Sequence, residues 1–210
     1  SLLTQIEVDP ADPAFQQPSK PIGPLFGEDE AKQLAEARGW HIARDGAHYR
    51  RVVPSPAPIR ILEIGVIELL VDQGVIVICA GGGGIPTVRR ADGGLVGVEA
   101  VIDKDLASSL LARELGADAL LMLTDVDAVS IDWGKPGARA IRRISPAMIR
   151  RYRFAAGSMG PKVEAACAFV EQTGGIAGIG GLEDAQAILA GKAGTLVVAD
   201  ASEVSWWDQG

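Results

Sequence analysis

The sequence predicts an α/β protein: a three-layer αβα sandwich with a mainly parallel central sheet and a small protruding α+β insertion. Three observations support this prediction. Short apolar runs that suit buried strands alternate with amphipathic segments of helix length over most of the chain. A hydrophobic content of 48% with 26 glycines is typical of strands that are buried on both faces. The length of 210 residues allows one α/β domain, or one and a half small ones.

The first 51 residues predict a strand and then a protruding subdomain. Residues Thr4–Val8 alternate as a short strand does, and the proline-rich stretch Asp9–Pro24 predicts an ordered excursion because proline restricts the backbone. Glu28–Arg38 predicts an amphipathic helix that Gly39 closes. Two further short strands are expected around the turn RDGAH: Trp40–Ala43 and Tyr49–Val53.

The middle of the chain predicts a helix, a central strand and a hairpin. Ile61–Gln73 has apolar residues at helical spacing and is followed by Gly74. The wholly apolar run Val75–Ala80 predicts a central parallel strand that ends in four glycines. Val88–Gly97 predicts a polar hairpin around the turn Asp92–Gly94.

The second half continues the alternation of helices and strands. Pro146 stands in the first turn of a predicted helix, which is its favoured place, and the tail with Trp206 and Trp207 fits no periodic element. We expect this tail to dock onto the chain itself or onto a partner. The predicted elements are the helices 105–115, 145–152, 161–172 and 183–190, the strands 119–124, 176–179 and 195–198, a variable loop over 131–143 and a small-residue loop over 154–160.

Composition excludes several classes of function. The net charge of −7 argues against nonspecific nucleic-acid binding, which needs a basic face. No apolar run is long enough to span a membrane, and the first residues do not form a signal peptide, so we expect a cytoplasmic protein. Cys79 and Cys167 each lie in an apolar segment and are expected to be unbridged buried thiols. His41 and His48 have no partners at metal-ligand spacing, so no metal site is predicted and both are expected on the surface.

The glycines Gly81, Gly82, Gly83 and Gly84 follow the predicted central strand. Consecutive glycines let backbone N–H groups approach an oxyanion closely, which suits a phosphate- or substrate-binding loop. The alternative is a tight turn that needs positive φ angles. Pro86 excludes a dinucleotide-binding fingerprint, and no Gly-Lys-Ser/Thr follows to make a P-loop.

Two lysines stand at the starts of predicted helices. Lys104 precedes Asp105, and Lys162 follows the glycine-containing loop SMGP. A cation at a helix amino terminus opposes the helix dipole, and a bound phosphate would restore the balance. Taken alone, Lys104 is better explained as a surface lysine beside a capping aspartate. The pair together predicts a phosphate that is held from two sides.

The segment Thr124, Asp125, Val126, Asp127 and Ala128 follows a predicted buried strand. Hydroxyl and carboxylate groups at the carboxyl end of such a strand suit a ribose hydroxyl or a metal-bound water. A polar turn that caps the next segment explains the same residues.

Taken in order, these motifs resemble those of the carbamate kinases, a branch of the amino acid kinase family. The resemblance covers most of the chain from residue 4 to about residue 198. The matching stretches are DPADPAF and KPIGP within 9–24, YRRVVPSP (49–56), AGGGGIP (80–86), GVEAVIDKDLAS (97–108), LTDVDAV (123–129) and FAAGSMGPKVEAA (154–166).

The resemblance implies phosphoryl transfer between ATP and carbamate, or the reverse from carbamoyl phosphate to ADP, with Mg²⁺ bound mainly through the nucleotide phosphates. It also implies a homodimer with no nucleic-acid or membrane partner. Lys104 and Lys162 would hold the transferring phosphoryl group, Asp105 would orient them, and Lys20 would reach in from the protruding subdomain. The segments that would line the nucleotide are Thr124–Ala128 and Met159, Gly160, Pro161 and Lys162, with Gly81–Gly84 as backbone donors to phosphate or substrate.

The chain also departs from the family pattern. The amino-terminal strand with its Gly-Gly-Asn loop and a later Gly-Asn-Gly-Pro loop are not in this sequence, so we expect the chain alone to be inactive or impaired. The alternatives are a noncatalytic nucleotide-binding or regulatory homologue, and an amino acid kinase with another acid substrate. The expected divisions are a substrate-lobe remnant (1–8), the protruding subdomain (9–51), the rest of the substrate lobe (52–97), the nucleotide-binding lobe (98–199) and a tail (200–210).

Overall fold

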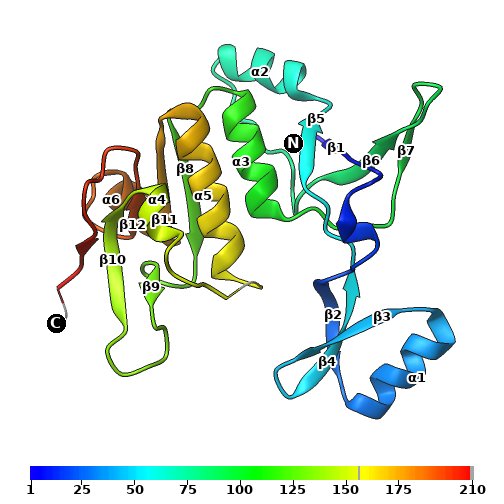
Figure 1. Ribbon diagram of the computed structural model, residues 1–210. Helices are drawn as coiled ribbons and strands as arrows, with labels where there is room; N and C mark the ends of the chain where they lie inside the picture. The colour runs from blue at the N-terminus through cyan, green and yellow to red at the C-terminus, as the bar shows by residue number, and fades with distance from the viewer. Residues whose placement is uncertain (156, 209–210) are drawn as a thin grey trace. The chain divides into compact units, whose positions relative to one another are not determined.

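The computed structural model describes residues 1–155 and 157–208, and its contacts divide the chain into two units, Ser1–Ala107 and Ser108–Gly210. Ala156, in the predicted loop 154–160, and residues 209–210 of the tail lie outside the described residues. Helix α3 (Lys104–Glu114) crosses the boundary between the units. The predicted α/β class is confirmed, because helices and strands alternate along both units (Figure 1).

Unit one contains a four-stranded sheet in the order β5-β1-β6-β7. Strand β1 pairs antiparallel with β5 and parallel with β6, so this sheet is mixed. Ile6 and Ile61 face each other across β1 and β5 and are both fully buried. The elements are β1 (Gln5–Val8), β5 (Pro58–Ile61), β6 (Ile85–Arg89) and β7 (Leu95–Gly97), with α2 (Ile64–Asp72) between β5 and β6.

The protruding subdomain is a three-stranded antiparallel sheet with one helix, which adds one strand to the predicted helix and hairpin. Strand β4 lies between β2 and β3, and α1 contacts β3 and β4 (Figure 1). Helix α1 has the predicted bounds and ends at Gly39, whose φ of +64° gives the left-handed cap. The elements are a short 3-10 helix (Pro13–Phe15), β2 (Lys20–Phe26), α1 (Glu28–Arg38), β3 (His41–Asp45) and β4 (His48–Val53); strand β2 was not predicted.

Two predictions about the middle of the chain are wrong. Residues 75–80 form no strand, and Ile76 is 94% exposed. The run is strand-forming by composition, but no strand pairs with it in the described chain. Its longer-range bonds are isolated ones, from Leu2 N to the Ile78 carbonyl at 2.9 Å and from Ala80 N to Thr4 Oγ1 at 2.7 Å. The helix predicted from Ile61 begins at Ile64, because Ile61 ends strand β5, where it pairs with Ile6 of β1, and Leu62 N donates to the Gln5 carbonyl.

Unit two contains a six-stranded assembly in which β13, β10, β12, β11 and β8 lie side by side and β9 pairs with β10. The pairs β8–β11 and β10–β12 are parallel, whereas β11–β12 and β10–β13 are antiparallel. The expectation of a mainly parallel sheet is therefore wrong in detail: both larger sheets are mixed. The strands are β8 (Ala119–Thr124), β9 (Ser130–Ile131), β10 (Arg139–Ile144), β11 (Ile176–Gly181), β12 (Thr195–Val197) and β13 (Ser205–Trp206).

Helices cover this sheet on two faces. Gly178 and Gly180 point to one face of β11, where an added Cβ would meet Ile188 of α6 at 2.5 and 2.8 Å. Ala177 and Ile179 alternate with them, are fully buried, and leave the other face to α5. The helices are α4 (Pro146–Ile149), α5 (Met159–Thr173) and α6 (Ala185–Leu189), and all are close to the predicted segments.

Two predicted irregular segments are ordered. The variable loop 131–143 contains the β9–β10 pairing, and the tail forms β13 at the edge of the sheet. Among the described residues no helix is long and apolar enough to cross a membrane. Cys79 and Cys167 are unbridged, as predicted; Cys167 is buried, but the expectation that Cys79 is buried is wrong, because its side chain is only partly covered. Burial raises the pKa of Cys167 to about 11 and also raises the pKa of Cys79. His41 and His48 are exposed, also as predicted.

Candidate functional site

The amino terminus of α3 is built around Asp103, a residue that the sequence reading overlooked. Its Oδ1 accepts hydrogen bonds from Asp105 N at 2.9 Å and Leu106 N at 3.3 Å, which makes it the cap of the helix. Its Oδ2 lies 2.5 Å from Lys20 Nζ. The cap is therefore Asp103 and not Asp105. An aspartate immediately before a helix is a sequence signal for such a cap.

The environment of Asp103 favours its charged form. Burial alone would raise the pKa of Asp103, but the Lys20 ammonium and the two backbone N–H donors outweigh burial and place this pKa below its usual value. Lys104 Nζ lies 3.8 Å from Asp105 Oδ2, and the Lys104 side chain is largely exposed. Two lysines and two aspartates thus converge at the start of α3.

The glycine loop lies beside the same helix start. A Cβ on Gly83 would stand 2.2 Å from the Ile102 carbonyl oxygen, and one on Gly84 would stand 2.7 Å from the Ile6 side chain. Gly83 and Gly84 are therefore required by packing and by φ angles of +134° and +85°. Gly81 and Gly82 face open space, so they remain the candidates for backbone donors to a ligand.

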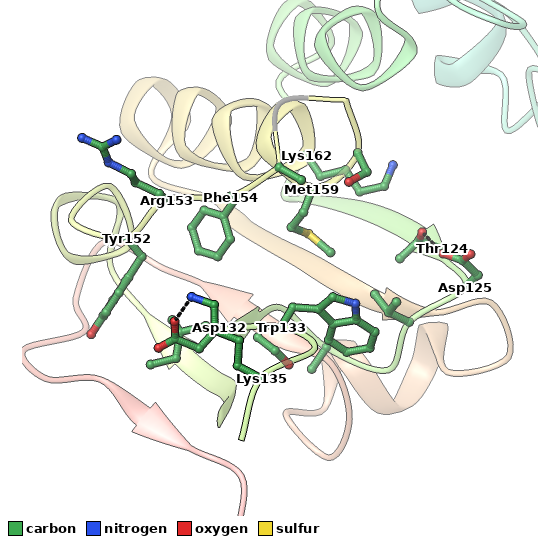
Figure 2. Close-up of a pocket in the computed structure, with 16 residues that line it drawn as sticks. Thr124, Asp125, Asp132, Trp133, Lys135, Tyr152, Arg153, Phe154, Met159 and Lys162 are labelled. Carbon is green, nitrogen blue, oxygen red and sulfur yellow. Dashed lines mark hydrogen bonds and ion pairs between the residues drawn. The ribbon is translucent and has the colours of Figure 1, made fainter. Parts of the chain in front are cut away.

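Unit two holds a cavity of about 700 Å³ at the carboxyl end of β8 (Figure 2). Figure 2 shows Phe154, Met159 and Trp133 turned toward the same space. Thr124 Oγ1 donates to Asp125 Oδ1 at 3.1 Å on the rim. The lining residues come from four segments: Thr124, Asp125, Val126 and Ala128; Ser130, Ile131, Asp132, Trp133 and Lys135; Tyr152, Arg153, Phe154 and Ala155; and Ser158, Met159 and Lys162.

Hydrogen bonds and ion pairs tie the segments around this cavity to the rest of unit two. Val129 N donates to Thr195 Oγ1 at 2.9 Å, and that hydroxyl donates to the Ile141 carbonyl at 2.5 Å, so the loop after β8 is tied to β12 and β10. Arg150 forms ion pairs with Glu164 and Glu171 of α5, which raise the pKa of Arg150 above its usual range. Lys162, in the second turn of α5, is only 8% exposed.

The predicted site residues thus fall into two groups. Lys20, Lys104, Asp105 and the glycine loop meet in unit one, whereas most of the predicted nucleotide segment lines the cavity of unit two. Asp127 lines a neighbouring cavity of about 600 Å³ that shares Asp125, Val126 and Trp133 with the first. Gly160 and Pro161 lie in the first turn of α5 without lining either cavity.

The aromatic lining was not predicted. Trp133 lies in what the sequence suggested was a variable loop, and Tyr152 and Phe154 stand at the end of a helix and the start of a loop. A usable signal was the presence of large apolar rings in polar, glycine-rich segments, where no core requires them.

The match to known proteins is extensive. Residues 18–179 match the model of the amino acid kinase family. The chain belongs to the amino acid kinase family. It is 54% identical to a carbamate kinase of Haemophilus influenzae, over 99% of this chain and 67% of that protein. It is 50% identical to a carbamate kinase of Escherichia coli strain K12, over 94% of this chain and 65% of that protein.

A solved structure shares the fold of this chain. The structure of carbamate kinase from Giardia lamblia bound to AMP-PNP superimposes with a TM-score of 0.83 and 46% identity, over 95% of this chain and 65% of that one. The chain therefore spans about two thirds of the length of the relatives that it matches.

Proposed function

We propose that this chain binds ATP or ADP in the cavity of unit two and that the protein transfers a phosphoryl group between ATP and carbamate. The observation that carries the proposal is the cavity itself, in which aromatic and apolar side chains meet Lys162 on α5 (Figure 2). The relatives named as carbamate kinases and the neighbour bound to AMP-PNP support this assignment.

The nucleotide fits the cavity by chemistry. Trp133, Phe154 and Met159 offer apolar surface for a base, and the hydroxyl and carboxylate of Thr124 and Asp125 suit a ribose. The buried ammonium of Lys162 suits a phosphate, because a charge in a water-poor site acts with little screening. The segment Thr124–Ala128 and the first turn of α5, Met159–Pro161, would enclose the nucleotide.

The reaction needs positioning more than acid–base chemistry. An anionic carbamate oxygen would attack the γ-phosphorus, the bond from that phosphorus to the bridging oxygen would break, and ADP would leave with the bond's electrons. In unit two, Lys162 would hold the transferring group. In unit one, Lys104 is the second lysine proposed to bind it, Asp105 would orient Lys104, Asp103 would orient Lys20, and Gly81 and Gly82 would offer backbone donors. No general base is required.

Mg²⁺ fits this site as an ion that the nucleotide's phosphates carry. In residues 1–155 and 157–208 no group of three or more His, Cys, Asp or Glu side chains could hold a metal ion by itself. Asp125 and Asp132 line the cavity and would accept hydrogen bonds from water on such an ion. When bound, Mg²⁺ would neutralise phosphate charge. A homodimer in the cytoplasm is part of the same proposal.

Calorimetric titration of AMP-PNP with Mg²⁺ into the chain tests nucleotide binding. We expect a dissociation constant on the order of 10 to 100 μM, within the range typical of enzyme substrates. Lys162→Met should weaken binding at least tenfold, whereas Lys32→Met, which removes an exposed lysine on α1, should not. A folded chain that does not bind millimolar AMP-PNP would refute the proposal.

A noncatalytic nucleotide-binding protein is the second candidate, because the cavity lies wholly within unit two and accounts for nucleotide binding by itself. Phosphorus NMR of the chain with ADP, Mg²⁺ and carbamoyl phosphate separates the two. Formation of ATP supports the kinase, and binding without ATP formation supports the second candidate.

A further inference from the structure

The last strand, β13, forms the edge of the sheet in unit two and is only two residues long. Trp206 and Ser205 pair with Ile141 and Arg143 of β10, and Trp207 N donates to the Ala140 carbonyl at 3.0 Å. A strand of two residues forms few backbone hydrogen bonds. The position of β13 at the sheet edge therefore depends on the contacts of its side chains.

Trp206 connects the sheet edge to the nucleotide cavity. The Arg139 guanidinium stands 4.0 Å from the centre of its ring system, and the Tyr152 ring lies edge-on, with centroids 6.4 Å apart and planes at 79°. This T-shaped geometry is a favourable one for aromatic pairs. Tyr152 lines the cavity and Trp206 does not. Trp206 therefore contacts the cavity wall from behind.

Trp207 supports a second part of the same wall. Its Nε1 donates to the Gly194 carbonyl at 2.8 Å, and Arg142 stacks on its ring at 4.9 Å. Its side chain lines the neighbouring cavity together with Trp133 and residues 125–128. Trp133 and Asp125 line both cavities. A change at Trp207 thus reaches residues that face the nucleotide.

We propose that Trp206 and Trp207 are positioning residues for nucleotide binding: β13 holds Tyr152 and the loop after β8 in the arrangement that accepts the base. The proposal rests on the proposed function, because it assigns the ligand of the cavity to a nucleotide. It extends that function to residues that would not touch the ligand.

Variants of the full chain test the proposal by titration with AMP-PNP. Trp206→Ala should raise the dissociation constant by about three- to tenfold, as expected for the loss of one or two ring contacts. Trp206→Phe should restore most of the affinity because it keeps the edge-on ring. Trp40→Ala is the matched control: Trp40 also has two arginines, Arg38 and Arg51, against its ring, but lies in unit one.

A second ligand separates positioning from general destabilisation. Inorganic tripolyphosphate probes only the phosphate end, so its affinity should be unchanged in Trp206→Ala while that of AMP-PNP falls. Equal losses for both ligands, or an unchanged affinity for AMP-PNP in a folded variant, would overturn the proposal. If Trp206→Ala does not fold, Arg139→Gln and Trp207→Phe carry the same comparison.

Hydrogen–deuterium exchange without nucleotide makes the result independent of the proposed function. We expect faster exchange in residues 124–133 and 152–155 of Trp206→Ala and Trp207→Ala. An increase confined to β10 and β13 would contradict the inference even if the chain binds AMP-PNP. Failure of the unaltered chain to bind AMP-PNP would refute the nucleotide assignment. Faster exchange in residues 124–133 and 152–155 of the variants would even then show that β13 holds these segments in place.

Discussion

Lys20 Nζ lies 2.5 Å from Asp103 Oδ2, although 83 residues separate the two along the chain. The same carboxylate caps α3 through its other oxygen. One side chain therefore fixes both the start of the helix that carries Lys104 and the position of a lysine on β2. This relationship joins the protruding subdomain to the glycine loop within unit one.

Replacing Asp103 should destabilise the protein in two separable steps. Asp103→Ala removes the cap and the ion pair, and we expect a loss of about 2 kcal/mol in the free energy of unfolding. Asp103→Asn keeps an oxygen for the cap and loses the charge, so its loss should be smaller, about 1 kcal/mol. Urea unfolding followed by circular dichroism measures both. Equal losses would mean that the cap contributes nothing.

The Asp103 pair should also give a specific dependence of stability on pH. The pKa of Asp103 is lowered in the folded state, so its contribution is fully present above the unfolded value of about 3.9 and is lost as the pH falls through the folded value. The stability difference between the unaltered chain and Asp103→Asn should therefore be constant from pH 7 to pH 5 and shrink below pH 4. Urea midpoints across this range measure it. A difference that grows on acidification would contradict the assignment.

The glycine loop allows packing and ligand binding to be tested separately. Gly83→Ala should cost about 3 kcal/mol or more, because its Cβ would stand 2.2 Å from a carbonyl oxygen and its φ is +134°. Gly82→Ala should fold normally, since its Cβ meets open space. Thermal unfolding compares the two. If Gly82→Ala is stable but phosphoryl transfer is impaired, the loop acts on the ligand; equal destabilisation of both variants would contradict the observed packing.

Trp133 should matter for ligand binding and little for folding. Its side chain is 70% exposed, so Trp133→Ala should change the free energy of unfolding by less than about 1 kcal/mol. Loss of stacking on the base should raise the dissociation constant of AMP-PNP by about tenfold. Trp133→Phe should keep much of the affinity. Calorimetry and urea unfolding check the two effects, and unchanged affinity in Trp133→Ala would place the base elsewhere.

Local signals predicted the elements of this fold better than its pairings. The bounds of α1 followed from its periodicity and from Gly39, because helix ends are set by nearby residues. The directions of β12 and β13 and the pairing of residues 58–61 with β1 depend on distant partners, which periodicity does not reveal. The same reason explains the error over residues 75–80.

In the candidate site, too, residues marked by local signals were predicted, and residues that depend on distant partners were not. Lys104, Lys162 and the segment after β8 stand at ends of elements, where position along the chain suggests their exposure to a ligand. Asp103 was overlooked because its neighbours Lys104 and Asp105 carry the more conspicuous charges, and only the folded chain brings Lys20 to it. Trp133 and Tyr152 meet across a cavity whose walls come from separate segments.

The apolar run 75–78 should be replaceable without loss of stability. Ile76 is 94% and Ile78 is 67% exposed, so the double variant Ile76→Thr, Ile78→Thr should change the free energy of unfolding by less than about 1 kcal/mol. Threonine keeps the branching at Cβ and removes apolar surface, so self-association measured by sedimentation velocity should decrease. Ile61→Thr is the control: this isoleucine is fully buried, and its replacement should cost about 3 kcal/mol. A loss in the double variant as large as that in the control would mean that the run is packed in solution.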